Sequence, residues 1–214
     1  MTITKVNYRS RTAKLIIAAW FCLGIALISL DAVIQPQLAA LGHYPLIRLV
    51  AEYWQNIGAT NGIICFLITG ALTIPQDRAK TFITFVLIVC VTGAVVQVVK
   101  HLIGRARPNA VHDQNHFYGP FGIFYHGPQI QLDSMPSGHT TVAFAMAVAL
   151  SYRWPRLCPL WFVLASGVAF ARTLVDRHFP SDVIIGSCLG TAIGWGISIL
   201  RSKAVLLKEN PCVF

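Results

Sequence analysis

Long apolar stretches and short polar segments alternate along the whole chain. Each of six apolar stretches predicts a helix that crosses a membrane, because these runs carry few or no charges. The stretches cover residues 14–34, 57–74, 81–99, 137–150, 157–175 and 181–200. This pattern predicts an all-α, polytopic membrane protein with six transmembrane helices, in a single domain spanning residues 1–214.

Three details refine this alternation. Residues 31–55 are mixed, and their apolar positions recur at helical spacing, which predicts either an amphipathic helix at the membrane interface or an ordinary connecting helix. Residues 104–135 form the longest polar segment and predict a loop, and a loop of this length is more often functional than idle. In the last apolar stretch, small residues predict close packing against another helix. These are Gly186, Gly190, Gly194 and Gly196.

The composition supports a membrane location and argues against nucleic acid as a partner. Apolar residues make up 55% of the chain, and charged residues only 12%, about half the usual share in a soluble domain. The net charge is +9, but Lys and Arg occur in short clusters between apolar runs and form no basic stripe. Membrane topology explains this positive charge better than nucleic-acid binding does.

The distribution of basic residues also predicts an orientation. Six spans place both termini on one side, and eleven of the 17 Lys and Arg residues fall on that side. By the positive-inside rule, the N-terminal segment 1–13 and the tail 201–214 are then cytoplasmic. The six exceptions on the outer side are Arg48, Lys100, Arg105, Arg107, Arg172 and Arg177. Charges that oppose the topology bias close to a membrane are candidates for a functional site.

Three short segments carry reactive side chains, and the predicted topology brings them to the same outer face. They cover residues 100–108, 136–139 and 172–182. In the second segment, Ser137 is a good N-cap residue, and a helix N-terminus offers unpaired N–H groups to an anion. Gly138 allows a ligand to approach the backbone closely. The start of this helix is therefore a potential phosphate site.

The side chains of the three segments suit phosphoryl transfer. Lys100, Arg107 and Arg172 supply positive charge and N–H donors, and the planar fork of arginine matches phosphate oxygens. Two histidines, His139 and His178, allow one ring to attack phosphorus while the other protonates the leaving oxygen.

Asp182 follows His178 by four residues and falls in the first turn of the helix predicted to begin near Pro180. From there its carboxylate can accept the His178 N–H, set the tautomer and stabilise positive charge on the ring. Taken singly, each of these polar residues also fits an ordinary role, such as an interfacial anchor. Their grouping on one face favours a common site.

The order and spacing of these residues resemble the three-part signature of the type 2 phosphatidic acid phosphatase (PAP2) family, which also includes the vanadium haloperoxidases. Six residues separate Lys100 from Arg107-Pro108, then comes Pro136-Ser137-Gly138-His139, then Arg172 with five residues to His178 and three more to Asp182. The resemblance covers roughly residues 57–200. One departure is Ala171, which stands where the family often has Ser and removes one potential hydrogen bond to phosphate.

The resemblance implies a role for each residue. His178 would be the nucleophile that forms a phosphohistidine, Asp182 would orient it, and His139 would be the general acid for the leaving group. The phosphate would be held by Lys100, Arg107, Ser137, Gly138 and Arg172. No metal or other cofactor is expected, because cationic side chains can supply the charge that a metal would supply.

These observations predict a metal-independent lipid phosphatase with its site between helices at the extracytoplasmic face of a bacterial cytoplasmic membrane. Its partners would be membrane lipids and a lipid phosphate substrate. Candidate substrates are a polyprenyl pyrophosphate, phosphatidate, phosphatidylglycerol phosphate and a lipid A-type phosphate. The alternative is a transporter or flippase that binds lipid phosphate without cleaving it, which explains the cations but not the histidines. Peroxidase or haem chemistry fits the apolar spans and the cationic setting of the histidines less well.

Overall fold

The computed structural model describes residues 3–57, 78–110, 114–120, 122 and 131–209. The α-helices in this part of the chain are α1 (Ile3–Leu27), α2 (Asp31–Gly42), α3 (Pro45–Ile57), α5 (Arg78–Ile103), α7 (Gly138–Arg153), α8 (Cys158–Leu174) and α9 (Pro180–Glu209). The described residues form no strand, and an isolated bridge pairs Arg105 with Phe117. The predicted all-α class is confirmed.

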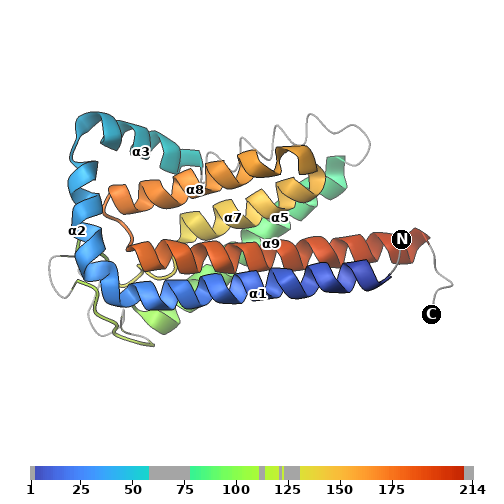
Figure 1. The fold of residues 1–214 in the computed structure, drawn as a ribbon, viewed down its shortest axis with the longest axis horizontal. Coiled ribbons are helices and arrows are strands. Elements are labelled where there is room, and N and C mark those ends of the chain that lie inside the picture. The colour runs from blue at the N-terminus through green and yellow to red at the C-terminus, as the bar shows by residue number, and fades with distance from the viewer. Residues whose placement is uncertain (1–2, 58–77, 111–113, 121, 123–130, 210–214) are drawn as a thin grey trace.

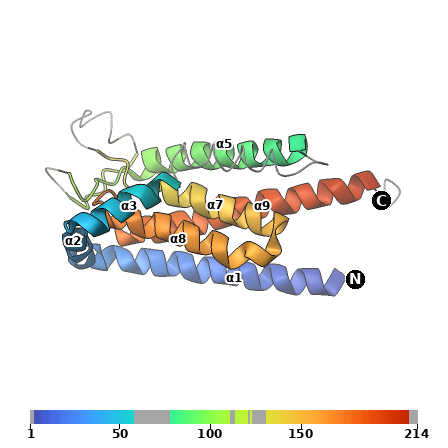
Figure 2. The same cartoon turned by 90° about the horizontal axis from the view of Figure 1, so that it is seen from above.

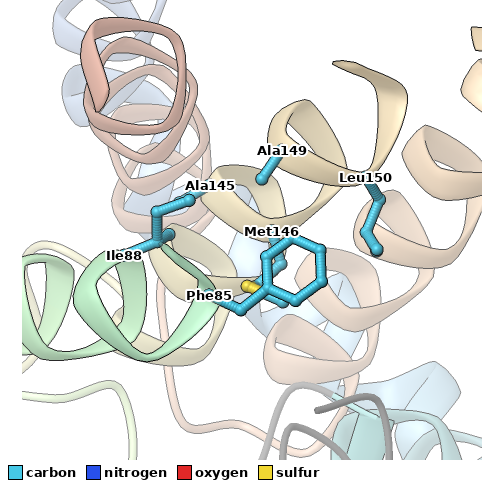
Figure 3. Packing of buried hydrophobic residues seen from close by; sticks show 6 residues of the cluster. All are labelled: Phe85, Ile88, Ala145, Met146, Ala149 and Leu150. Carbon is cyan, nitrogen blue, oxygen red and sulfur yellow. The ribbon is translucent and has the colours of Figure 1, made fainter. Parts of the chain in front are cut away.

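The helix α7 lies at the centre of the bundle. It packs against α5, α8 and α9, and Figure 2 shows it between α5 on one side and α8 and α9 on the other. Its residues from Ala145 to Leu150 are all buried. Phe85 and Ile88 of α5 close this core from the side, as Figure 3 shows. In a membrane, where lipid is as apolar as these side chains, such a helix holds the bundle together through close van der Waals packing.

Glycines on α9 bring it close to α7. A Cβ at Gly190 would collide with the carbonyl oxygen of Thr141, and a Cβ at Gly194 would lie 2.5 Å from that of Ala145. Gly186 is similarly close to the backbone of the α7 N-terminus. The predicted close packing is thus confirmed at these three positions. At Gly196 a Cβ would meet no described atom within 4 Å, so this glycine is not needed for the contact.

Four helical stretches are long and apolar enough to cross a membrane. They are Arg11–Gly42, Thr81–Ile103, Pro155–Leu174 and Pro180–Arg201. The predicted span 57–74 lies almost wholly outside the described residues. The fourth predicted span is α7, which has 16 residues and rises about 24 Å, less than the roughly 30 Å of a bilayer core. These helices support a membrane protein, and the count of six spans stays a prediction.

The mixed segment 31–55 forms α2 and most of α3. The helix α3 packs across α8, where Trp54 lies against Gly167 and its Nε1 donates to the carbonyl of Leu164 at 3.1 Å. The helix α3 also exposes large apolar side chains such as Leu46 and Tyr53. An exposed apolar face beside a polar one favours an interfacial helix over a plain connection.

The helix ends that carry the three motifs lie together. Figures 1 and 2 show that α5 ends, α7 begins, α8 ends and α9 begins at the end of the bundle where α2 lies. The helix α1 begins and α9 ends at the opposite end. The bundle therefore separates the motif-bearing end from the end where the chain starts and finishes.

Candidate active site

The predicted site residues come from four helix ends and the loops between them. Lys100 lies near the end of α5, Arg107 in the loop after it, Ser137, Gly138 and His139 at the start of α7, Arg172 near the end of α8, His178 just before α9 and Asp182 in its first turn. All of them are buried or half-buried. The structure thus brings every one of them to the same end of the bundle.

His178 is almost fully buried and is held through Nδ1. This nitrogen lies 2.7 Å from the backbone oxygen of Ser134 and 3.7 Å from Oδ2 of Asp182. Because a carbonyl oxygen only accepts, Nδ1 carries the proton, and the lone pair of the neutral ring lies on Nε2. The nearest acceptor is therefore the Ser134 carbonyl, and the Asp182 carboxylate that the sequence predicts for this bond acts from farther away as a charge.

The burial of His178 also affects its protonation. Loss of solvent lowers the pKa of His178 to about 4, although the negative charge of Asp182 acts in the opposite direction. The ring is then neutral at pH 7, which is the state in which Nε2 can act as a nucleophile.

Asp182 is fully buried and accepts hydrogen bonds from several groups. Arg105 Nη1 lies 2.5 Å from Oδ1, while Oδ2 accepts from Ser134 Oγ at 2.5 Å and from the Phe179 N–H at 2.9 Å. The helix α9 begins at Pro180, as predicted, so the carboxylate also sits in a first turn, where the helix dipole favours negative charge. These contacts hold Asp182 ionised and in one orientation.

Lys100 and Arg107 share a carboxylate, that of Asp133. Arg107 Nε and Nη2 each lie 2.7 Å from one of its oxygens, and Lys100 Nζ lies 3.4 Å from Oδ2. Partial burial acts to raise the pKa of Asp133, but the Arg107 hydrogen bonds and the two positive charges hold it well below its usual value. The Asp133 side chain is still 42% exposed, so this cluster opens toward solvent.

Arg172 provides a third cation from α8. Its Nη1 donates to Oε1 of Gln55 at 2.5 Å, which ties it to α3. Its Nε is buried and has no hydrogen-bond partner among the described residues. A buried donor of this kind suits an anionic oxygen. The neighbouring Ala171 packs with Ala51 and Leu174 in an apolar cluster against α3.

The N-terminus of α7 completes the site. Ser137 has the extended backbone of an N-cap residue, as predicted, but its side chain makes no capping bond and its Oγ accepts from Thr140 Oγ1 at 2.9 Å. Its backbone N–H donates to the carbonyl of Asp182 at 3.1 Å, which joins α7 to α9. His139 lies in the first turn of α7, within electrostatic range of Lys100, Arg107, Arg172 and His178.

Sequence analysis missed two buried residues behind the site. Arg105 donates to Asp182 and, through Nη2, to Asp31 Oδ2 at 2.6 Å, and all three side chains are 0% exposed. Arg105 does carry a sequence signal, because it is one of the six basic residues that oppose the topology bias. Asp31 is a lone carboxylate at the end of an apolar stretch, and its position by itself indicates no partner.

Comparisons with known proteins identify the family to which this chain belongs. Residues 81–205 match the family model of the PAP2 superfamily. A lipid A 1-phosphatase of Rhizobium etli is 35% identical over 104 residues, which are 49% of this chain and 42% of the relative. A second, from Rhizobium johnstonii, is 32% identical over 64% of this chain and 53% of the relative. The chain spans about half the length of these two curated relatives.

A decaprenylphosphoryl-5-phosphoribose phosphatase of Mycobacterium tuberculosis is 30% identical over 62% of this chain and 68% of its own length. Among solved structures, a PAP2-type phosphatidylglycerolphosphate phosphatase from Bacillus subtilis superposes with a TM-score of 0.69 at 19% identity, covering 92% of this chain and 97% of that one. Aquifex aeolicus LpxE gives a TM-score of 0.63 at 20% identity, over 79% and 95%. These two likenesses show a shared fold. Because the family model matches more than half of the chain, including all three motifs, the chain belongs to the PAP2 superfamily.

Proposed function

We propose that this protein is an integral-membrane lipid phosphatase that cleaves a phosphate ester or diphosphate through a phosphohistidine on His178. The observation that carries the proposal is the setting of His178. Its Nδ1–H is committed to Ser134, which leaves Nε2 as the nucleophilic nitrogen, and three cations lie around the same site. The relatives named as lipid phosphatases and an undecaprenyl-diphosphatase of Sulfolobus acidocaldarius support the same class of reaction.

The proposed reaction has two steps. In the first, His178 Nε2 bonds to phosphorus, the bond from phosphorus to the lipid oxygen breaks, and protonated His139 gives its proton to that oxygen. In the second, water attacks the phosphohistidine, His139 takes a proton from the water, and inorganic phosphate leaves as the bond to His178 breaks. Asp182 stabilises the positive charge that the ring carries between the two steps.

The cations hold the phosphate in this proposal. Arg172 offers the buried Nε donor, and Lys100 and Arg107 offer the donors that now meet Asp133. The α7 N-terminus at Ser137 and Gly138 adds its dipole. The charge that develops on the phosphate oxygens is thus met by preorganised donors.

A groove beside the site supports a lipid substrate. It has a volume of about 520 Å³, lies between α3 and α8, and is lined almost wholly by apolar side chains such as Ile47, Val50 and Phe170. Ala171 and Leu174, on either side of the Arg172–Thr173 pair, also line it. A phosphate held at Arg172 would therefore leave its lipid tail next to an apolar surface that can contact it.

We place the site on the extracytoplasmic side of a bacterial cytoplasmic membrane, with six spans and cytoplasmic termini. The support is the excess of Lys and Arg on the predicted terminal side, together with the separation of the motif-bearing end from the end where α1 begins. A reporter enzyme that is active only in the cytoplasm, fused after residue 214, tests this arrangement. Reporter activity would support a cytoplasmic C-terminus, and its absence would contradict the proposed orientation.

The first test is phosphate release by detergent-purified protein in the presence of EDTA. The panel contains a lipid A 1-phosphate, a polyprenyl diphosphate, phosphatidate and phosphatidylglycerol phosphate, with a short-chain soluble phosphate ester for comparison. The lipid A 1-phosphate comes first because two relatives carry that activity in their names. We expect release from at least one lipid, little from the soluble ester, and none by His178→Ala.

The same assay distinguishes the phosphatase hypothesis from the hypothesis of a lipid transporter. A folded wild-type protein that binds these lipids but releases phosphate from none of them would overturn the proposal and favour transport. Trapping of ³²P on wild-type protein, but not on His178→Ala, would identify the phosphohistidine directly.

A further inference from the structure

A network of ionic contacts, formed by Asp31, Arg105 and Asp182, links α2 to the nucleophilic histidine. Asp31, in the first turn of α2, lies 2.6 Å from Arg105 Nη2, and Arg105 Nη1 lies 2.5 Å from Asp182. Asp182 in turn is the charge nearest to His178. Asp31 lies outside residues 81–205, which match the family model. The N-terminal helices thus contribute a residue to the site as well as a membrane span.

The contacts leave Arg105 little freedom. Its guanidinium lies over the ring of Phe179 at 4.2 Å and near that of Phe117 at 5.0 Å. It also donates to Asn115 and Ser181. Asp31 is held equally firmly, since it accepts the Ser181 N–H at 3.1 Å and the Ser181 hydroxyl. Every charge in this network is therefore fixed in place and away from water.

The net charge of the network formed by Asp31, Arg105 and Asp182 matters for the reaction. With both carboxylates ionised, Asp31 and Asp182 are negative and Arg105 is positive, so the three together carry one negative charge. If Arg105 faced Asp182 alone, the two charges would cancel, and Asp182 would stabilise a positive ring on His178 much less. In this low-dielectric setting the effect of one unbalanced charge is large.

We propose that Asp31 and Arg105 are positioning residues that orient Asp182 and set the net negative charge acting on His178. Arg105 holds Oδ1 of Asp182, so that Oδ2 is presented to Ser134 and His178. Asp31 offsets the charge of Arg105, so that Asp182 keeps its effect on the ring. This inference rests on the proposed function, because it assigns the network to the same nucleophile.

The test makes the net charge of the network less negative in one variant and more negative in another. Asp31→Asn removes one negative charge and leaves the network neutral, while Arg105→Gln removes the positive charge and leaves two unbalanced carboxylates. The double variant Asp31→Asn/Arg105→Gln restores one net negative charge. We expect each single variant to lower kcat roughly tenfold or more with little change in KM, and the double variant to exceed both.

A direct readout is the titration of His178, followed by NMR of ¹³C-labelled histidine and assigned with His178→Asn. Asp31→Asn should lower the titration midpoint and Arg105→Gln should raise it, each by roughly one pH unit. The other titratable or charged groups that face His178 are Lys100 of α5, Asp133 of the preceding loop, His139 of α7 and Arg172 of α8. None of them is changed in these variants, so the two opposite shifts report on the network alone.

Glu52→Gln is the matched control. Glu52 is an exposed carboxylate of α3 that pairs with Arg48 at 2.9 Å, so its loss changes charge at the same end of the bundle without touching the network. It should leave both kcat and the His178 titration unchanged. The double variant has the same net charge as the wild-type network, and it keeps the test valid if a single variant does not fold.

Two results would overturn the inference. One is a His178 titration that moves in the same direction, or not at all, in the two single variants. The other is a double variant no better than the worse single variant while it keeps the wild-type thermal midpoint. The NMR titration needs no substrate, so a wild-type protein without phosphatase activity would contradict the proposed function and leave this readout intact.

Discussion

Two clusters of the same chemistry lie a few residues apart in this site. In the inner cluster, Arg105 bridges Asp31 and Asp182, and every side chain is 0% exposed. In the outer cluster, Arg107 and Lys100 share Asp133, whose side chain is 42% exposed. Both clusters pair an arginine with carboxylate oxygens at 2.5 to 2.7 Å. They differ in their access to water.

That difference decides what each cluster can do. A buried ion pair cannot exchange its partner for water without a large desolvation cost, so the inner cluster is a fixed part of the fold. A half-exposed carboxylate can turn into solvent and give way to another anion, so Arg107 and Lys100 remain open to a phosphate. Arg105 pairs with Asp31 of α2 and Asp182 of α9, whereas Arg107 pairs with Asp133 of the loop before α7.

The largest expected effect comes from breaking the inner cluster at Asp182. Asp182→Asn removes the charge next to His178 and leaves Arg105 with one carboxylate. Phosphate release should fall at least roughly a thousandfold, and the thermal midpoint in detergent should fall by roughly 10 °C. Rate assays and thermal unfolding of the same preparation check both. A stable variant with wild-type turnover would show that Asp182 is not coupled to the nucleophile.

The outer cluster should respond in binding more than in turnover. Arg107→Lys keeps the charge but loses the planar fork that now meets both oxygens of Asp133. KM for the lipid substrate should rise roughly tenfold, with a smaller change in kcat and an unchanged thermal midpoint. Arg48→Lys, at an exposed position of α3, is the control. An unchanged KM for Arg107→Lys would remove Arg107 from the phosphate site.

The pH dependence should report the burial of His178. Its pKa, lowered to about 4, leaves the ring neutral above that value, so loss of the neutral nucleophile should lower kcat/KM about tenfold per pH unit below about pH 4. The proposed general acid, His139, must be protonated, so its deprotonation should add a separate fall in kcat/KM at higher pH. The folded-state pKa lies below the unfolded value of about 6.5, so His178 contributes stability that is full above pH 6.5 and lost as pH falls through 4.

This stability term is measurable without substrate. The thermal midpoints of wild type and of His178→Asn, followed from pH 8 to pH 4, should respond differently to acid, with wild type losing more. A constant gap between the two across this range would mean that His178 does not change its protonation there.

The smallest expected effect is also the one that distinguishes the clusters most directly. Asp133→Asn frees Lys100 and Arg107 from their carboxylate, so inorganic phosphate should inhibit about fivefold more tightly, equivalent to about 1 kcal/mol. The gain should shrink as salt is raised, and the thermal midpoint should barely move. Weaker inhibition by phosphate would show instead that Asp133 holds the two cations in place for the substrate.

Features that depend on residues close together in the sequence could be predicted, and features that depend on residues far apart in the sequence could not. The helical class, the membrane character and the start of α7 at Ser137 depend on periodicity and capping within a few residues, and the structure confirms them. The span count did not follow as simply. The segment 57–74 lies almost wholly outside the described residues, and α7, with 16 residues, is shorter than a bilayer core requires and is covered by its neighbouring helices.

The site divides in the same way. The motif residues His139, His178 and Arg172 could be named in advance, because each motif is contiguous and the topology alone carries it to one face. The contacts of Arg105 could not, since its partners Asp31 and Asp182 lie 74 and 77 residues away in sequence. The same holds for Ser134, whose backbone carbonyl holds a histidine 44 residues later.

By itself, then, the sequence determined which residues are candidates for the chemistry and at which end of the helices they lie, because apolar periodicity and motif spacing are local properties. Only the tertiary structure decided that Arg105 is buried in an ion-pair network and that Arg107 lies in a cluster accessible to solvent. That choice depends on desolvation, and desolvation depends on what the rest of the chain packs around each side chain.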